Sequence, residues 1–229
     1  MIKILKSSSR GKTEIDWLDS YHSFSFSEYY NPEQMHFSFL RVINEDIIAP
    51  HNGFPMHSHQ DMEIITYIIS GELTHKDSLG NTQKITKGEV QLMRAGTGIT
   101  HSEFNFDQNI PVHLLQIWII PRQKGLTPSY QQKLFTQTPN ELSKIISGSP
   151  SKNILHIEQD VEIYSCKLIN DNIRYEALSG HKLWLQVVSG DISLSSNTLS
   201  AGDGASITDE TKIVIKSNGN SEFLLFDFV

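Results

Sequence analysis

The sequence predicts an all-β protein built from two consecutive domains of the same design. Runs rich in valine, isoleucine, threonine and aromatic residues favour strands, and glycine, proline and asparagine turns separate them. No stretch shows the apolar period of an amphipathic helix. Residues 67–73 (Tyr-Ile-Ile-Ser-Gly-Glu-Leu) recur as Gln-Val-Val-Ser-Gly-Asp-Ile at residues 186–192, and residues 87–90 correspond to 201–204. This internal repeat indicates two copies of one β-barrel or sandwich.

The expected elements follow the chain in order. Residues 1–35 are expected to lie as an arm on the first domain, anchored by Phe24, Phe26 and Tyr29. Strands are predicted at residues 37–43, 62–69, 89–93 and 112–120, and in the second half at 153–158, 161–169, 183–188, 191–195, 212–216 and 222–228. The polar, proline-containing and glycine-containing stretch between these halves predicts a connection, within which residues 130–134 and 141–146 could form short structured pieces. The predicted limits are therefore 1–121 for the first domain, 122–150 for the connecting segment and 151–229 for the second domain.

Composition indicates an ordinary globular protein and excludes some partners. Of the 229 residues, 38% are hydrophobic and 20% charged, which is usual for a chain that buries a core. The net charge of −7 argues against direct nucleic-acid binding, which requires a basic surface. No apolar run is long enough for a membrane span or a signal peptide. A single cysteine, Cys166, is typical of a reducing compartment, so we expect a cytoplasmic protein.

Two short patterns form the strongest functional signal. His57 and His59 are separated by one residue, and so are His101 and Glu103. Alternate residues of a strand point to the same face, so each pair can aim two ligands at one point. Two adjacent strands would then form a cup of three imidazoles and one carboxylate. This donor set suits a first-row transition metal better than calcium or magnesium, which prefer oxygen ligands.

The segments around these residues resemble a known family. Residues 61–67 (Asp-Met-Glu-Ile-Ile-Thr-Tyr), 75–81 (His-Lys-Asp-Ser-Leu-Gly-Asn) and 95–103 (Ala-Gly-Thr-Gly-Ile-Thr-His-Ser-Glu) look like motifs of the pirin family, a branch of the cupin superfamily. The resemblance is dense from about residue 16 to 121 and thinner beyond. It implies a bicupin of two consecutive jelly-roll barrels. One departure is His-Phe-Ser-Phe at residues 36–39, where the family pattern has a smaller segment that contains glycine.

The resemblance also implies a metal centre. His57, His59, His101 and Glu103 would hold one divalent transition metal, which in this family is usually Fe(II). The general affinity series favours copper, nickel and zinc over iron in a given site, so nickel, copper, manganese, cobalt and zinc are alternatives. The second domain is expected to lack such a site. The positions reached by the same steps from its own glycines are Glu176, Leu178, Ile215 and Ser217.

Two functions are implied by the family. Bacterial pirin-like proteins resemble quercetin 2,3-dioxygenases, which open the central ring of a flavonol with O2 and release carbon monoxide. In such an enzyme Glu103 would also act as a base toward the 3-hydroxyl of a flavonol-like substrate. The alternative is a metal-containing, redox-sensing regulator that binds a protein partner without catalysis. Sugar isomerisation, as in other cupins, is a more distant third. A monomer is expected, because two domains can bury faces within one chain.

Several other residues receive structural interpretations. His75 is expected to face solvent or to cap a hairpin, and Cys166 to fill a buried strand position. Asp61, Glu63 and Ser102 are candidate acceptors for the second ring N–H of the ligand histidines.

Overall fold

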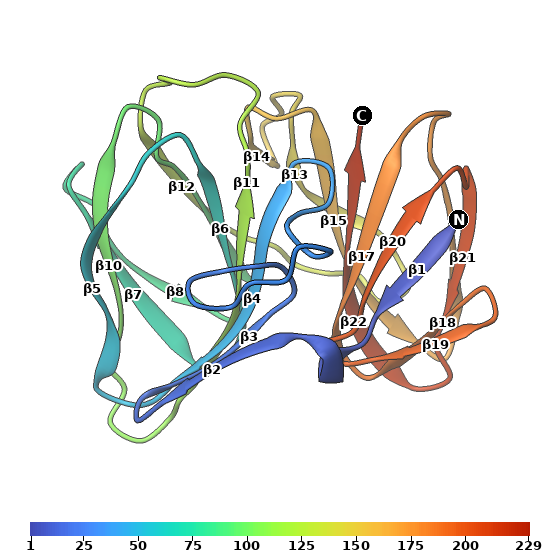
Figure 1. Cartoon of the computed structure of the whole chain (residues 1–229), viewed down its shortest axis with the longest axis horizontal. Helices are drawn as coiled ribbons and strands as arrows, with labels where there is room; N and C mark the ends of the chain where they lie inside the picture. Colours follow the sequence, from blue (N-terminus) through green and yellow to red (C-terminus); the bar gives the residue numbers. More distant parts are fainter. The chain divides into compact units, whose positions relative to one another are not determined.

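The computed structural model describes residues 1–229 and confirms the all-β class (Figure 1). The only helix is the three-residue 3-10 turn η1 (Ser7–Ser9), so no helix is long and apolar enough to cross a membrane. The chain divides into two compact units. The N-terminal unit comprises Gly11–Phe135 with Ile157–Gln159, and the C-terminal unit comprises Met1–Arg10, Thr136–His156 and Asp160–Val229.

The N-terminal unit consists of a seven-stranded and a four-stranded antiparallel sheet. The larger sheet has the order β12 (Ser129–Leu134), β9 (Glu89–Arg94), β6 (Glu63–Ser70), β11 (Val112–Ile119), β4 (Leu40–Ile48), β3 (Leu18–His22) and β2 (Gly11–Ile15). The smaller sheet has the order β5 (Asn52–His59), β10 (Ile99–Asn105), β7 (Glu72–Asp77) and β8 (Thr82–Thr86). Apolar side chains from both sheets, such as Ile68 of β6 and Leu73 of β7, pack in one core cluster, so the two sheets form a sandwich.

The C-terminal unit repeats this arrangement. Its seven-stranded sheet has the order β1 (Ile2–Leu5), β20 (Gly204–Thr208), β17 (Lys182–Ser189), β22 (Asn220–Phe228), β15 (Val161–Ile169), β13 (Ser143–Ser147) and β14 (Leu155–His156). Its four-stranded sheet has the order β16 (Asn172–Glu176), β21 (Lys212–Lys216), β18 (Asp191–Leu194) and β19 (Asn197–Ser200). Every pairing is antiparallel except that of β13 with β14.

The predicted internal repeat matches the strand order of the two units. In the large sheets, β9-β6-β11-β4 corresponds to β20-β17-β22-β15, and the two small sheets correspond strand for strand. The repeated Ser-Gly turns adopt the same backbone, with φ of +77° at Gly71 and +71° at Gly190. A Cβ at either glycine would lie within 2.6 Å of a backbone oxygen, so both turns require glycine for space and for conformation.

The ends of the predicted segments differ from the structure in two places. The first ten residues belong to the C-terminal unit, where β1 pairs with β20 (Figure 1). This contact is anchored by Lys6, whose Nζ lies 2.8 Å from the buried carboxylate of Asp203. Residues 122–150, expected as a connection, contain β12 and β13. These strands lie close to the two short structured pieces, residues 130–134 and 141–146, that the sequence allowed within this segment.

Most of the predicted strands are present. Those predicted at residues 161–169 and 212–216 coincide with β15 and β21, whereas 153–158 contains only the two-residue β14. Cys166 is fully buried on β15, and burial raises the pKa of its thiol to about 12. The thiol is therefore an apolar filler, as expected, rather than a nucleophile.

Candidate metal centre

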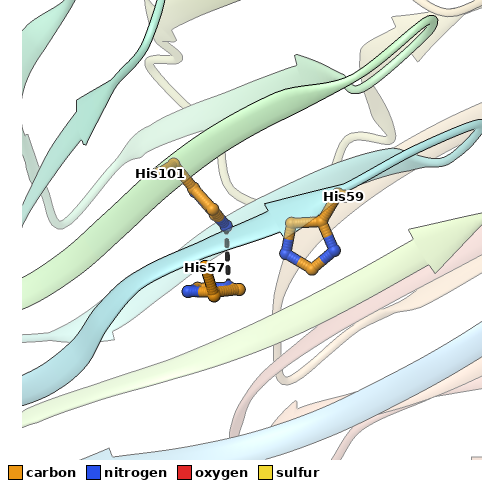
Figure 2. A group of neighbouring side chains, drawn as sticks. All are labelled: His57, His59 and His101. Atoms are coloured by element: carbon orange, nitrogen blue, oxygen red, sulfur yellow. Dashed lines mark hydrogen bonds between the residues drawn. The ribbon is translucent and has the colours of Figure 1, made fainter.

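Strands β5 and β10 bring the predicted histidines together. The two strands are antiparallel neighbours, and His101 lies directly opposite His57 in their register. His59 follows two residues after His57, on the same face of β5. Figure 2 shows the three side chains converging, two from β5 and one from β10. A ring nitrogen of each histidine lies within 4.8 Å of the others, close enough for one metal ion.

The geometry and protonation of these imidazoles suit a divalent metal. The Nε2 atoms of His57 and His101 are 3.0 Å apart. Two nitrogens bound at about 2.1 Å and at right angles to each other would be separated by about 3.0 Å. Burial, with the neighbouring imidazoles, lowers the pKa of His101 to about 3 and that of His59 to about 4. Both rings are therefore neutral at pH 7 and offer a lone pair.

Glu103, the fourth predicted ligand, is buried beside this cluster. Its carboxylate groups with His101 and His75 rather than with the set of His57 and His59. The amide of Gln116 donates to Oε2 at 2.7 Å, and the hydroxyl of Thr66 lies 3.3 Å from Oε1. These contacts orient a carboxylate that lines the same cavity as His57 and His59. Its assignment as a ligand stays a prediction, as do those of the three histidines.

The acceptor for the outer ring nitrogen of His57 differs from those predicted. His57 Nδ1 lies 2.8 Å from the backbone carbonyl of Pro55. Asp61 instead accepts from the backbone of Gly125 at 2.8 Å. Glu63 accepts from Arg94 and from the backbone N–H of Glu158. The carboxylates of Asp61 and Glu63 therefore accept hydrogen bonds from neighbouring chain segments.

The prediction for His75 is wrong, because the side chain is fully buried. His75 Nδ1 lies 3.4 Å from Nδ1 of His101, and His75 Nε2 lies 3.0 Å from Asp77 Oδ2. The sequence signal that could have revealed this is the His-x-Asp spacing, which puts both side chains on one face of β7. The burial of that face depends on a distant part of the chain, because the ring of Tyr130 on β12 packs against His75.

A cavity of about 360 Å³ opens beside the histidines. His57, His59 and Glu103 line one side, and Phe26, Phe54 and Trp118 supply aromatic surface. The opposite wall carries the polar residues Thr13, Ser20, His22, Asn44 and Asp46. A largely apolar cavity with a few convergent polar groups is the usual form of a small-molecule site.

Two hydrogen-bonded pairs build the polar wall. His22 Nδ1 donates to Asn44 Oδ1 at 2.8 Å, while its Nε2 lies 2.9 Å from the hydroxyl of Thr13. The hydroxyl of Ser20 donates to the buried carboxyl of Asp46. Burial, together with the charge of Glu103, raises the pKa of Asp46 to about 7. Asp46 therefore offers a carboxyl group that gains or loses a proton near neutral pH.

This pKa shift predicts a pH-dependent difference in stability between the metal-free protein and its Asp46→Asn variant. The unfolded carboxyl loses its proton near pH 4, whereas the folded one keeps it until about pH 7. The folded state therefore binds more protons in this window, and stability contributed by Asp46 falls as pH rises. We expect the variant to gain up to about 4 kcal/mol relative to wild type between pH 4 and pH 8. Urea unfolding of both proteins measures this, and parallel pH curves would contradict it.

Gly53 allows β5 to approach β10 beside the site. A Cβ at this position would lie 2.2 Å from the carbonyl oxygen of Glu103 and 2.6 Å from Cα of Phe104. The register of the two strands shifts here, between His101 and Glu103. Because the obstacle is backbone, a larger residue must push the two ligand-bearing strands apart.

Gly53→Ala is therefore expected to destabilise the protein by about 1–3 kcal/mol, the usual cost of overpacking. Thermal and urea unfolding would measure the change. Gly219→Ala is the matched control, since a Cβ there meets nothing within 4 Å. Equal stability of the two variants would show that the strands separate at no cost.

In the C-terminal unit, apolar side chains fill the corresponding interior. Strands β16 and β21 occupy the places of β5 and β10, and Ile173, Ile213 and Ile215 from these strands belong to the buried core cluster. Ile215 is one of the positions that the repeat aligned with a ligand. This unit therefore keeps the scaffold and uses its interior for packing.

Both halves of the chain match known protein families. Residues 5–119 match the Pirin family and residues 144–228 match the quercetinase C-terminal cupin domain. A protein of Escherichia coli strain K12 named quercetin 2,3-dioxygenase is 42% identical and covers 99% of this chain and 98% of its own length. A pirin-like protein of Caulobacter vibrioides is 37% identical, with 95% of each chain covered.

Solved structures give the same relationship. The E. coli bacterial pirin YhhW, in a crystal structure described as a complex with nickel(II), superimposes with a TM-score of 0.96 at 41% identity. The match covers 100% of this chain and 99% of that one. A quercetin 2,3-dioxygenase structure from Acinetobacter baumannii, with a TM-score of 0.78 and 20% identity over 99% of this chain and 85% of that one, shares the fold.

Proposed function

The chain belongs to the pirin family, within the cupin superfamily, and on this premise we propose that it is a metal-dependent dioxygenase that cleaves flavonol-like substrates with O2. His57, His59 and His101 hold the metal, and Glu103 serves as fourth ligand and as base. The relatives named quercetin 2,3-dioxygenase and the nickel complex of YhhW support this proposal.

The observation that carries the proposal is the cavity beside the three histidines. Its volume of about 360 Å³ lies within the range of about 300–1,000 Å³ that is usual for small-molecule sites. Phe26, Phe54 and Trp118 give it the apolar surface that a flat aromatic ring system requires. The polar wall of Ser20, Asn44 and Asp46 offers hydrogen-bonding groups to ring hydroxyls.

A bound divalent metal would supply Lewis-acid polarisation, which lowers the pKa of a substrate hydroxyl. The protein supplies the proton acceptor, because the Glu103 carboxylate faces the cavity. Gln116 and Thr66 hold that carboxylate in place, so it need not reorganise when it takes the proton. The aromatic walls exclude water from the substrate ring during the reaction.

The proposal includes a choice of metal and setting. Fe(II) is the ion we assign, because histidine and carboxylate ligands with open positions are typical of non-haem iron oxygenases. Nickel, cobalt, copper, manganese and zinc are the alternatives to compare. We assign the protein to the cytoplasm as a monomer, consistent with its single buried cysteine.

Oxygen consumption tests the proposed reaction. Metal-free protein is loaded separately with Fe(II), Ni(II) and Co(II), and each form is mixed with quercetin while O2 and flavonol absorbance are followed. We expect one O2 consumed per flavonol with at least one metal and none without metal. Luteolin, a flavone that lacks the 3-hydroxyl, is the matched substrate control and should not react.

Two failures have different meanings. Protein that binds one metal per chain but consumes no O2 with any flavonol would refute the dioxygenase proposal and leave the metal centre intact. The regulator alternative would then predict a protein partner whose binding changes with the metal or its oxidation state. Protein that binds no metal at all would refute the proposed ligand set.

A further inference from the structure

The buried pair formed by His75 and Asp77 lies behind the proposed metal centre. Both residues are on β7, two positions apart, and neither side chain is exposed to solvent. Strand β10 pairs with β7 so that Asp77 is opposite His101 and His75 is opposite Glu103. The pair therefore contacts the ligand histidine from the side away from His57.

The contacts define one consistent hydrogen-bond chain. Nε2 of His101 faces Nε2 of His57, so the other nitrogen, Nδ1, is left for His75. Nε2 of His75 lies 3.0 Å from the Asp77 carboxylate, which accepts only, so this nitrogen carries the proton. Nδ1 of His75 is then an acceptor, 3.4 Å from Nδ1 of His101. The proton of His101 belongs on Nδ1, which frees the lone pair of Nε2.

Asp77 is held firmly in this role. Its Oδ1 accepts from the backbone N–H groups of Leu79 and Asn81 at 2.9 and 3.0 Å, and its Oδ2 accepts from the side chain of Asn81 at 2.8 Å. The ring of Tyr130 packs on His75 with centroids 4.8 Å apart. The Asp77 carboxylate and the His75 ring are therefore held in place in the metal-free protein.

We propose that His75 and Asp77 are positioning residues that fix the tautomer of His101 and so present its Nε2 to the metal. This inference rests on the proposed metal centre, and it adds two residues to the four that were predicted. A direct ligand role for His75 is the competing assignment, because His75, His101 and Glu103 also form a group close enough for a metal. That assignment is disfavoured, since both ring nitrogens of His75 are engaged, one by Asp77 and the other by His101.

The variants Asp77→Asn and His75→Leu test two links of the hydrogen-bond chain from Asp77 through His75 to His101. An asparagine can donate to His75 Nε2, which would reverse the proton positions and put a proton on Nε2 of His101. Loss of an outer-shell partner typically weakens metal binding by about 10–100-fold, and we expect this range for both variants. His75→Gln retains an acceptor for His101 and should recover most of the affinity. Leu79→Ala lies in the same turn and is the matched control, because Leu79 gives Asp77 only its backbone N–H and its own side chain is exposed.

Three measurements are needed. Calorimetric titration with Ni(II) gives the affinity, the visible spectrum of the Co(II) form reports ligand number, and histidine-ring ¹⁵N NMR of the metal-free protein reports the His101 tautomer. We expect Nδ1–H in wild type and a shift toward Nε2–H in Asp77→Asn, without change of fold by circular dichroism. An unchanged tautomer and affinity in folded Asp77→Asn would overturn the inference.

The outcomes separate this inference from the proposed function. His75→Leu could lose Ni(II) binding completely, and the spectrum of its Co(II) form could indicate one nitrogen ligand fewer than in wild type. Together these results would make His75 a ligand and overturn the positioning role. If wild type binds no metal, the proposed function fails, yet the NMR tautomer in the metal-free protein still decides the inference. Retained affinity in His75→Gln supports it whether or not His75→Leu folds.

Discussion

The chain with His57→Ala is expected to lose stoichiometric metal binding. His57 and His101 point their Nε2 atoms at each other across 3.0 Å, and His59 completes a set whose ring nitrogens all lie within 4.8 Å of one another. Removing an imidazole leaves two nitrogen ligands. We expect a loss of affinity well beyond the roughly 10–100-fold that an outer-shell change costs.

Metal content after equilibration with buffered Ni(II) or Fe(II) measures this loss directly. His113→Ala is a matched control, because His113 is a partly exposed histidine of the same unit that pairs with Glu45 at 2.8 Å. The control should retain about one metal per chain, as expected if surface histidines contribute nothing. Equal metal content in the two variants would show that the metal binds elsewhere.

The clustering of the three histidines could be predicted from the sequence because its signal is local. The one-residue spacing within each pair fixes the direction of two side chains on a strand, whatever the rest of the fold does. The glycines add a second local signal, since Gly53 and Gly71 stand where backbones meet too closely for a Cβ. The internal repeat is also a local signal, because the Ser-Gly turns at Gly71 and Gly190 have the same sequence and backbone conformation.

What the sequence could not give is long-range pairing. The sequence around His75 predicts an exposed hairpin residue, because nothing nearby indicates that Tyr130 of β12 will pack on it. The pairing of β1 with β20 joins residues that are about two hundred positions apart, so no local pattern predicts it. The positive φ of Ser38, +49°, lies in the segment where the family pattern has glycine, a detail that only the backbone reveals.

Glu103→Gln is expected to separate metal binding from catalysis. Glutamine keeps the size of the side chain and can still accept from Gln116, but it cannot take a proton from a substrate hydroxyl. With three imidazoles left in place, saturating metal should still load one ion per chain. Loss of a positioned general base typically costs about 10²–10⁴-fold in rate, and we expect flavonol-dependent O2 uptake to fall by this factor.

Glu45→Gln provides the control, because Glu45 is another partly buried acid that pairs with His113 away from the cavity. Glu103→Asp adds a second comparison, since it keeps a carboxylate but shortens its reach. Partial activity in Glu103→Asp with none in Glu103→Gln would assign the proton transfer to the carboxylate.

Loss of metal in Glu103→Gln would instead make ligation the main role of Glu103. Full activity there would remove Glu103 from the mechanism, and the raised pKa of Asp46 across the same cavity would make that carboxyl the next base to test.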